Sequence, residues 1–474
     1  VVSEPGDGAD GTFYLGPHWF FREENVAYAR SELVVISPVG RELIVEVTGD
    51  VPAPQREDRD GFEVRRWRVD ESPAAPTEPG SPPLPEFLPS VHVGWGVNQQ
   101  RVVRRFFDEA IDLTPVDPRI VRIAQRIVEP ASPRARAERA QRLYRWVLAN
   151  VEEGEETDGR RVVVGKQGNR GRAFATLCRA IGLDVRYAVA QNRITAPPRG
   201  PITEAMLFSQ LLMQVEAETG PIWLTVGNKY APFGYLPAEV RGMPAYLLAG
   251  SGPRLTETPA DGSRDGLEYE GEAVLATSGS AKLALAEHFV GRHAMAARND
   301  LAELAERRIP DVLQALVAQD LRGARLDDHA IENLDELDAP VTLRLEIAVP
   351  ALAEPEGGKL VLAPPFAVRV NQLATLPTRQ TPLLIATATY RRVRLRIELP
   401  PGAVVESTLD RRVVTDGDRR VVVADRVERN VLVLDRTVDL PAGRVQPDEY
   451  AAFVAFARRA DEAQTAAIRI RLRP

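Results

Sequence analysis

The chain has 474 residues, of which 44% are hydrophobic and 27% are charged. This is ordinary globular composition and excludes a wholly disordered chain; at roughly 150 residues per domain the length predicts about three domains. The 60 Lys and Arg residues are nearly balanced by 67 Asp and Glu, for a net charge of −7. This balance argues against a nucleic-acid partner. No apolar run reaches the roughly 18 residues of a transmembrane helix.

Residues 11–69 alternate apolar and polar side chains between turn residues, a pattern typical of short strands in a β-sandwich. Prolines crowd residues 71–89, which predicts an extended connector, because proline disrupts both helices and inner strands. We therefore expect a β-rich N-terminal domain over residues 1–94.

Residues 95–250 have mixed signals that predict an α+β domain. Ile120, Ile123 and Ile127 share one helical face, and Ser132-Pro133 predicts the start of a second helix. Further along, we expect a strand at 160–164, a glycine-rich loop at 165–171, a helix at 173–181, and strands at 185–190, 207–215 and 222–226.

The remaining residues, 251–474, predict a β-rich C-terminal domain. A helical insertion at about 300–319 is broken near Pro310, and strands flank Asp416-Gly417 as in a hairpin. A last amphipathic helix is expected over 448–462. The fold class predicted for the chain is thus multidomain α+β.

The chemistry-bearing residues are few. Cys178 is the single cysteine, so no internal disulfide can form, and the five histidines have no spacing typical of a metal site. Gly165, Gly168 and Gly171 recur at three-residue steps but lack the flanking residues of a nucleotide-binding loop. We therefore expect neither a metal nor a cofactor.

The middle block resembles the bacterial transglutaminase-like domain, a papain-related fold that occurs between two β-rich domains of unknown function in multidomain envelope proteins. The resemblance rests on four segments in order: 143–147 (LYRWV), 177–183 (LCRAIGL), 222–224 (IWL) and 233–237 (FGYLP), the last followed by Arg241-Gly242. It extends outward to Pro38, Gly40, Glu78-Pro79 and Trp95, and to residues 445–450 with Phe453 and Phe456.

The resemblance implies a catalytic Cys at a helix N-terminus, a His that accepts its proton, and an Asp that orients the His. At the Cys position this chain has Gln167, or Arg170 if Gly168-Asn169-Arg170 is aligned instead. Gln210 and Thr225 stand at the His and Asp positions. None of these side chains supplies a thiolate or takes a proton near neutral pH, so the triad is degenerate. We expect Cys178 to be a buried structural residue, because free cysteine commonly packs as a small hydrophobe.

The leading hypothesis is therefore a non-catalytic, protein- or peptide-binding or structural module. The helix N-terminus at Gly168, Asn169, Arg170 and Arg172 would attract a carboxylate or a peptide carbonyl. The alternatives are a peptidase or acyl transferase with relocated residues, and a subunit of a larger assembly. The resemblance also implies a periplasmic or outer-surface location. It further implies strands before Val1, so that a truncated N-terminal domain would expose a sheet edge to another chain.

Overall fold

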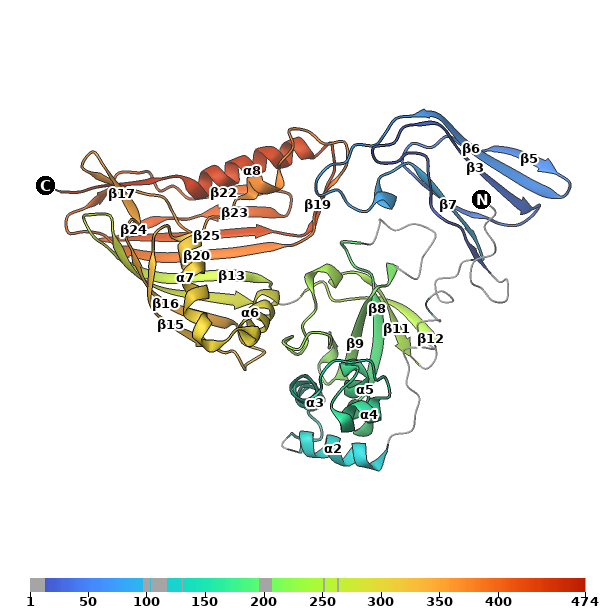
Figure 1. Cartoon of the computed structure of the whole chain (residues 1–474), viewed down its shortest axis with the longest axis horizontal. Coiled ribbons are helices and arrows are strands. Elements are labelled where there is room, and N and C mark those ends of the chain that lie inside the picture. The colour runs from blue at the N-terminus through green and yellow to red at the C-terminus, as the bar shows by residue number, and fades with distance from the viewer. Residues whose placement is uncertain are drawn as a thin grey trace.

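The computed structural model describes residues 13–96, 103, 117–129, 131–195, 207–249, 252–261 and 264–473. The described residues form a β-rich N-terminal region, a central region of helices and strands, and a large β-rich C-terminal region with helices (Figure 1). The expected multidomain α+β class is confirmed at this level. No helix in the described part of the chain is long and apolar enough to cross a membrane.

The N-terminal region is built from two sheets. One contains β1 (Tyr14–Leu15), β2 (Trp19–Phe20), β4 (Ile44–Thr48) and β7 (Ser90–Trp95); the other has the order β3 (Tyr28–Pro38), β6 (Phe62–Ser72), β5 (Gln55–Arg59). Trp67 from the second sheet is buried with Val91 and Val93 from the first, so the two sheets pack face to face. From residue 13 onward, where the structure describes the chain, the alternating pattern thus forms a sandwich.

The central region has a five-stranded antiparallel sheet in the order β10-β9-β8-β11-β12. Its strands are β8 (Val185–Ala190), β9 (Gln210–Ala217), β10 (Gly220–Leu224), β11 (Pro244–Ala249) and β12 (Gly252–Glu257), and its helices are α2 (Pro118–Val128), α3 (Arg136–Asn150), α4 (Gly159–Gly165) and α5 (Arg170–Ala180). Helix α5 packs against α2, α3 and α4 and against β8. The sheet continues through β12, past the boundary predicted at residue 250.

Two local predictions in the central region are wrong. Residues 160–164 belong to α4 and not to a strand, because Asp158 caps the helix at the amides of Arg160 and Arg161. The valine run that suggested a strand instead places Val162 and Val163 in the helical core.

The second predicted helix start, at Ser132-Pro133, is also misplaced. Helix α3 begins at Arg136, and Ala135 at its N-cap position makes no side-chain capping bond. Instead, the carboxylate of Glu218, from the turn between β9 and β10, accepts a hydrogen bond of 3.1 Å from the amide of Ala137. A distant residue therefore replaces the local cap.

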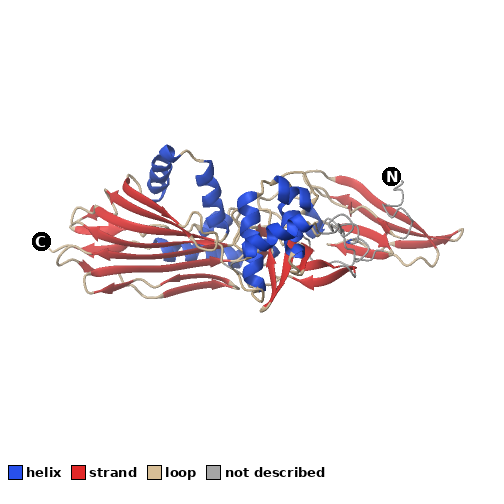
Figure 2. Ribbon diagram, turned by 90° about the horizontal axis from the view of Figure 1, so that it is seen from below, coloured by secondary structure: helices blue, strands red, loops and turns tan. Residues whose placement is uncertain are grey.

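The C-terminal region is organised around a nine-stranded sheet, and its strands lie on the side of the molecule where Figure 2 marks the C-terminus. Its strands are β13 (Gly266–Leu275), β14 (Ala281–Val290), β15 (Arg325–Glu332), β16 (Val341–Val349), β20 (Thr389–Glu398), β22 (Arg412–Asp416), β23 (Arg419–Val423), β24 (Arg426–Glu428) and β25 (Val431–Leu440). Smaller sheets contain β17 (Ala353–Glu356), β18 (Lys359–Leu362), β21 (Val404–Val405) and β27 (Ile468–Arg471), and β19 (Leu383–Ile385) with β26 (Gly443–Val445). The hairpin expected around Asp416-Gly417 is formed by β22 and β23.

Three helices accompany these sheets. The predicted break near Pro310 separates α6 (Arg292–Glu303) from α7 (Ile309–Asp320), with Pro310 in the first turn of the second helix. Proline is tolerated at that position because the amide it lacks would have no partner within the helix. Helix α8 (Tyr450–Thr465) buries Phe453 and Phe456 and lies along the sheet (Figure 1).

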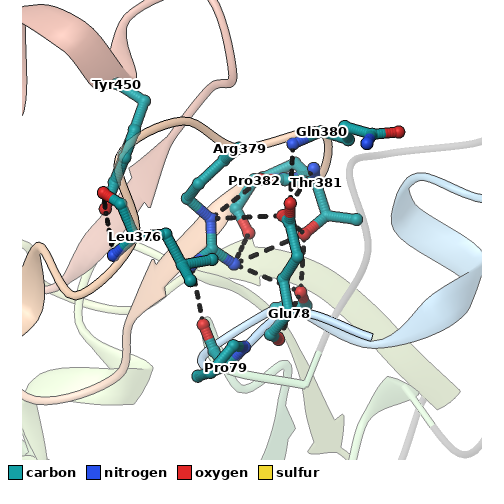
Figure 3. A network of polar contacts seen from close by, with 9 residues as sticks. Glu78, Pro79, Leu376, Arg379, Gln380, Thr381, Pro382 and Tyr450 are labelled. Atoms are coloured by element: carbon teal, nitrogen blue, oxygen red, sulfur yellow. Dashed lines mark hydrogen bonds and ion pairs between the residues drawn. The ribbon is translucent and has the colours of Figure 1, made fainter. Parts of the chain in front are cut away.

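The proline-rich connector is docked onto the C-terminal region by a buried polar network (Figure 3). The Glu78 carboxylate accepts hydrogen bonds from the amides of Gln380 and Thr381, both at 2.9 Å. Arg379, whose side chain is 1% exposed, lies 3.6 Å from the same carboxylate and donates to the carbonyl of Pro79 at 2.7 Å. Connector and C-terminal region thus share a buried ion pair.

Further polar contacts join the regions. Arg444 forms an ion pair with Glu86 of the N-terminal region and donates to the carbonyl of Arg193 of the central region at 2.8 Å. The loop between β15 and β16 presents Asp338, which forms an ion pair with Arg145 of α3 and accepts a 2.8 Å hydrogen bond from Gln141. The central region therefore contacts the C-terminal region on two sides.

We expect Arg379→Leu to loosen the docked connector, because it leaves the buried Glu78 carboxylate without its cation. Removing one partner of a buried ion pair typically costs about 3 kcal/mol, or roughly a hundredfold in local opening. Hydrogen exchange at the amides of Gln380 and Thr381 should report it. Arg411→Leu, at an exposed position, is the matched control; equal exchange in the two variants would contradict the role of the network.

A second charged group lies partly buried in the C-terminal region. Glu287 of β14 stands directly opposite Tyr269 of β13, whose ring stacks on Phe366 at 4.4 Å. Burial, with a smaller contribution from Asp320, raises the pKa of Glu287 to about 7. The carboxyl group is therefore easier to protonate in the folded chain than in the unfolded one.

Because this pKa is raised on folding, the stability that Glu287 contributes is fully present below pH 4.5 and is lost as the pH rises through about 7. We expect Glu287→Gln to match the wild type in thermal stability near pH 4. Above pH 8 the variant should be more stable, by on the order of 2 kcal/mol. Glu270→Gln, an exposed change on β13, should show no such pH dependence. A pH-independent effect of Glu287→Gln would contradict the assignment.

Candidate functional site

The segment that leads into α5 is held by its own backbone. The amide of Gly168 donates to the carbonyl of Glu152 at 2.9 Å, and that of Asn169 donates to the carbonyl of Glu156 at 2.8 Å. Gly168 has a φ of +130°, and a Cβ atom there would lie 2.6 Å from the carbonyl oxygen of Glu156. Only glycine fits this approach.

The start of α5 shows where the two predicted positions, Gln167 and Arg170, lie relative to the helix. Asn169 is the N-cap residue, and its side chain accepts a 2.9 Å hydrogen bond from the amide of Arg172. Arg170 is therefore the first helical residue. Gln167 is exposed, lies before the helix and forms a β-bridge with Glu152. A thiol at the helix N-terminus would correspond to Arg170 and not to Gln167.

The N-terminus of α5 is packed with side chains of this chain. Arg170 is 8% exposed, donates to the carbonyl of Val151 at 2.8 Å, and lies 3.9 Å from the carboxylate of Glu153. A Cβ atom on Gly171 would meet the Val226 side chain at 3.2 Å. The Arg172 guanidinium lies 5.7 Å from the centre of the Tyr187 ring. The binding predicted for Gly168, Asn169, Arg170 and Arg172 stays a prediction, at residues that already have partners within the chain.

Gln210 opens β9 opposite Ala190 of β8. Side chains alternate along a strand, so Gln210 shares a face with Leu212. Leu212 packs on the sheet face covered by Leu236 and Val240, whereas its neighbour Met213 belongs to the core shared with α5. The register thus places Gln210 on the side of the sheet that faces away from α5.

Thr225 follows the last residue of β10. Its carbonyl accepts a 2.9 Å hydrogen bond from the phenol of Tyr144, which also donates to the carbonyl of Ala231 at 3.0 Å. Tyr144 is fully buried in α3, and burial raises the pKa of its phenol. Tyr144 thus ties helix α3 to the loop after β10. Among the described residues, no hydrogen bond or ion pair joins Gln167, Gln210 and Thr225.

The sequence did not predict that Tyr144 joins α3 to the loop after β10. At that level, this residue served only as part of the 143–147 segment that supports the family resemblance. A tyrosine on the apolar face of a helix was the available signal, since a buried phenol requires a hydrogen-bond acceptor. The sequence does not show which carbonyl supplies it, because Thr225 and Ala231 lie far along the chain.

Cys178 is fully buried and unpaired, as expected. Burial raises the pKa of its thiol, so the thiolate required of a nucleophile is disfavoured. Within the described ranges, no group of three or more His, Cys, Asp and Glu side chains is arranged to hold a metal ion.

Comparison with known proteins gives two findings. Residues 358–470 match a domain family of unknown function, DUF3858. Across 96% of this chain and 74% of the other, the fold is similar to the crystal structure of a proposed protease from Parabacteroides distasonis ATCC 8503, with a TM-score of 0.55 and 11% sequence identity. No curated protein matches. The likeness places the chain among multidomain proteins of this fold and, at such identity, concerns the fold alone.

We expect native Cys178 to resist thiol-alkylating reagents, because its buried thiol is neither exposed nor ionised near neutral pH. Intact mass after incubation with iodoacetamide should remain unchanged in the folded protein. The same protein in denaturant should gain one label, which serves as the control for thiol integrity. Rapid labelling of the native chain would contradict a structural role for Cys178.

Proposed function

We propose that this chain is a non-catalytic, transglutaminase-like protein of the bacterial envelope that acts as a structural and protein-binding module. In this proposal, the central region has the ancestry of a papain-like enzyme but has lost its catalytic triad. The proposal rests on one observation. The first residue of α5 is a buried arginine, Arg170, at the position where such an enzyme needs its nucleophile.

The side chains at the three positions support the loss of catalysis. A guanidinium stays protonated and is not a nucleophile, and neither the Gln210 amide nor the Thr225 hydroxyl relays protons near neutral pH. Cys178 is the single cysteine and lies on α5 inside the core. A thiol mechanism would therefore require this region to unfold.

The packing around α5 supports a structural role for the old site. The Arg170 guanidinium donates a hydrogen bond to the carbonyl of Val151, and Gly171 lies close to the Val226 side chain. A substrate would have to displace these contacts to reach the helix N-terminus. Protein partners in this proposal therefore bind elsewhere on the molecule. The envelope location rests on the family resemblance.

We expect the purified chain to show neither amide hydrolysis nor amine transfer, because no described group at the three positions can form or activate a thiolate. Casein digestion and incorporation of a fluorescent amine into casein should both match the buffer control. Cys178→Ala should behave identically. Robust wild-type turnover that survives Cys178→Ala would show an active site elsewhere and would overturn the non-catalytic proposal.

The proposed ancestry can be tested separately with two triple variants. Both contain Gln210→His and Thr225→Asp, and the thiol is introduced by Arg170→Cys in one and by Gln167→Cys in the other. Arg170→Cys alone should be inactive, since it lacks a base. Because Gln210 lies on the face of the sheet away from α5, we expect a histidine there to leave both triple variants inactive. Cysteine-dependent turnover in the Arg170 series alone would contradict this register and place a base beside the start of α5, and turnover in the Gln167 series would contradict Arg170 as the thiol position.

A further inference from the structure

The N-terminal sandwich has an open side between its two sheets. Strand β3 has eleven residues and pairs with β6 along one edge; no other described strand pairs with it. In the facing sheet, β2 pairs with β7. The indole of Trp19 donates to the hydroxyl of the buried Ser31 at 3.2 Å, so β2 lies opposite β3 across the sandwich. Side chains rather than a backbone ladder join them.

A cleft of about 520 Å³ follows this open side. Three consecutive residues of β3, Arg30, Ser31 and Glu32, line it. Because neighbouring side chains of a strand point to opposite faces, a cleft that touches all three runs along the strand edge. Residues 18–20, Leu84 and Leu88 form its other walls. The edge of β3, a strand of the N-terminal region in Figure 1, is thus open to an extended chain along this cleft.

We propose that this edge pairs with β3 of a second copy of the chain, in an antiparallel, two-fold symmetric arrangement centred on Ser31. Strand addition at a free edge supplies main-chain hydrogen bonds along the whole contact. Two-fold pairing of identical strands joins the two β3-β6-β5 sheets into one continuous sheet. The two-fold axis makes every contact occur twice.

The charges of β3 select this register. Centred on Ser31, the pairing places Arg30 of one copy opposite Glu32 of the other, twice by symmetry, and sets Tyr28 against Val34. If the pairing were centred on Arg30 or on Glu32, that residue would face the same residue of the other copy, and two like charges directly opposite each other are unfavourable. A centre at Leu33 would place both charges opposite apolar residues. The register at Ser31 alone matches charge with opposite charge on the outer face.

The environment within one copy is compatible with this pairing. Arg30 lies 3.1 Å from Asp70, and Glu32 lies 2.6 Å from Arg66, both on β6. These ion pairs hold the two side chains along the sheet surface, where they can also reach a neighbouring strand. On the same outer face, Val34 and Ile36 are 39% and 65% exposed. Pairing would cover Val34 with a tyrosine ring.

Sedimentation equilibrium of the full chain tests the proposal. We expect the wild type to dimerise, and Arg30→Glu or Glu32→Arg alone to raise the dimer Kd by roughly tenfold or more, because each creates two like-charge pairs. An equimolar mixture of the two single variants should restore dimers. In the mixed dimer, Arg30→Glu of one copy faces Glu32→Arg of the other in one pair, and the unchanged Glu32 and Arg30 face each other in the second pair. Arg56→Glu, on the far strand β5, is the matched control and should dimerise as the wild type does.

Circular dichroism of each variant monitors folding, and restoration by mixing cannot arise from a misfolded chain. A wild type that remains monomeric would overturn the proposal, and would indicate that another segment or protein occupies the edge. Dimers that are insensitive to both charge changes, or single variants that do not recover on mixing, would overturn the register centred on Ser31. None of these outcomes depends on whether the central region is catalytic.

Discussion

The arrangement of this molecule depends on one buried ion pair, between Glu78 of the proline-rich connector and Arg379 of the C-terminal region. A carboxylate and a guanidinium withdrawn from water destabilise a fold unless each is paired and hydrogen-bonded. Here the carboxylate accepts two backbone amides, and the guanidinium also donates to the carbonyls of Pro79 and Thr381. The pair therefore joins two segments that lie 300 residues apart and brings the flanking β-rich regions together.

How far the sequence predicts this fold depends on the range of the interactions. Local sequence patterns predicted β8 with the bounds that the structure shows. They also predicted the strands of the sandwich, because burial of one face of a strand requires apolar and polar side chains to alternate. They failed at α4 and at the start of α3. Val162 and Val163 favour a strand by intrinsic propensity, and the cap and core of α4 override that preference. Glu218 accepts a hydrogen bond from an amide at the start of α3 and lies 81 residues from it along the chain, so no local sequence pattern indicates this contact.

The candidate site shows the same division. Sequence reasoning recognised that Gln210 and Thr225 cannot serve as base and orienting acid, because that conclusion needs only the chemistry of the side chains. It left Gln167 and Arg170 open as the nucleophile position, since the alternatives differ only in where α5 begins. The N-cap bond of Asn169 places that start at Arg170. The face on which Gln210 lies was equally inaccessible, because it depends on the pairing register with Ala190.

Arg170 also explains how the N-terminus of α5 is stabilised without a substrate. The positive end of a helix dipole disfavours a cation, and an anion is its natural partner. This chain places both Arg170 and Arg172 in the first turn. The Glu153 carboxylate lies 3.9 Å from the Arg170 guanidinium, and the Val151 carbonyl accepts a 2.8 Å hydrogen bond from the same guanidinium. In our proposal these internal groups compensate the unfavourable placement of a cation at the helix N-terminus, so the site is satisfied within the chain and needs no substrate.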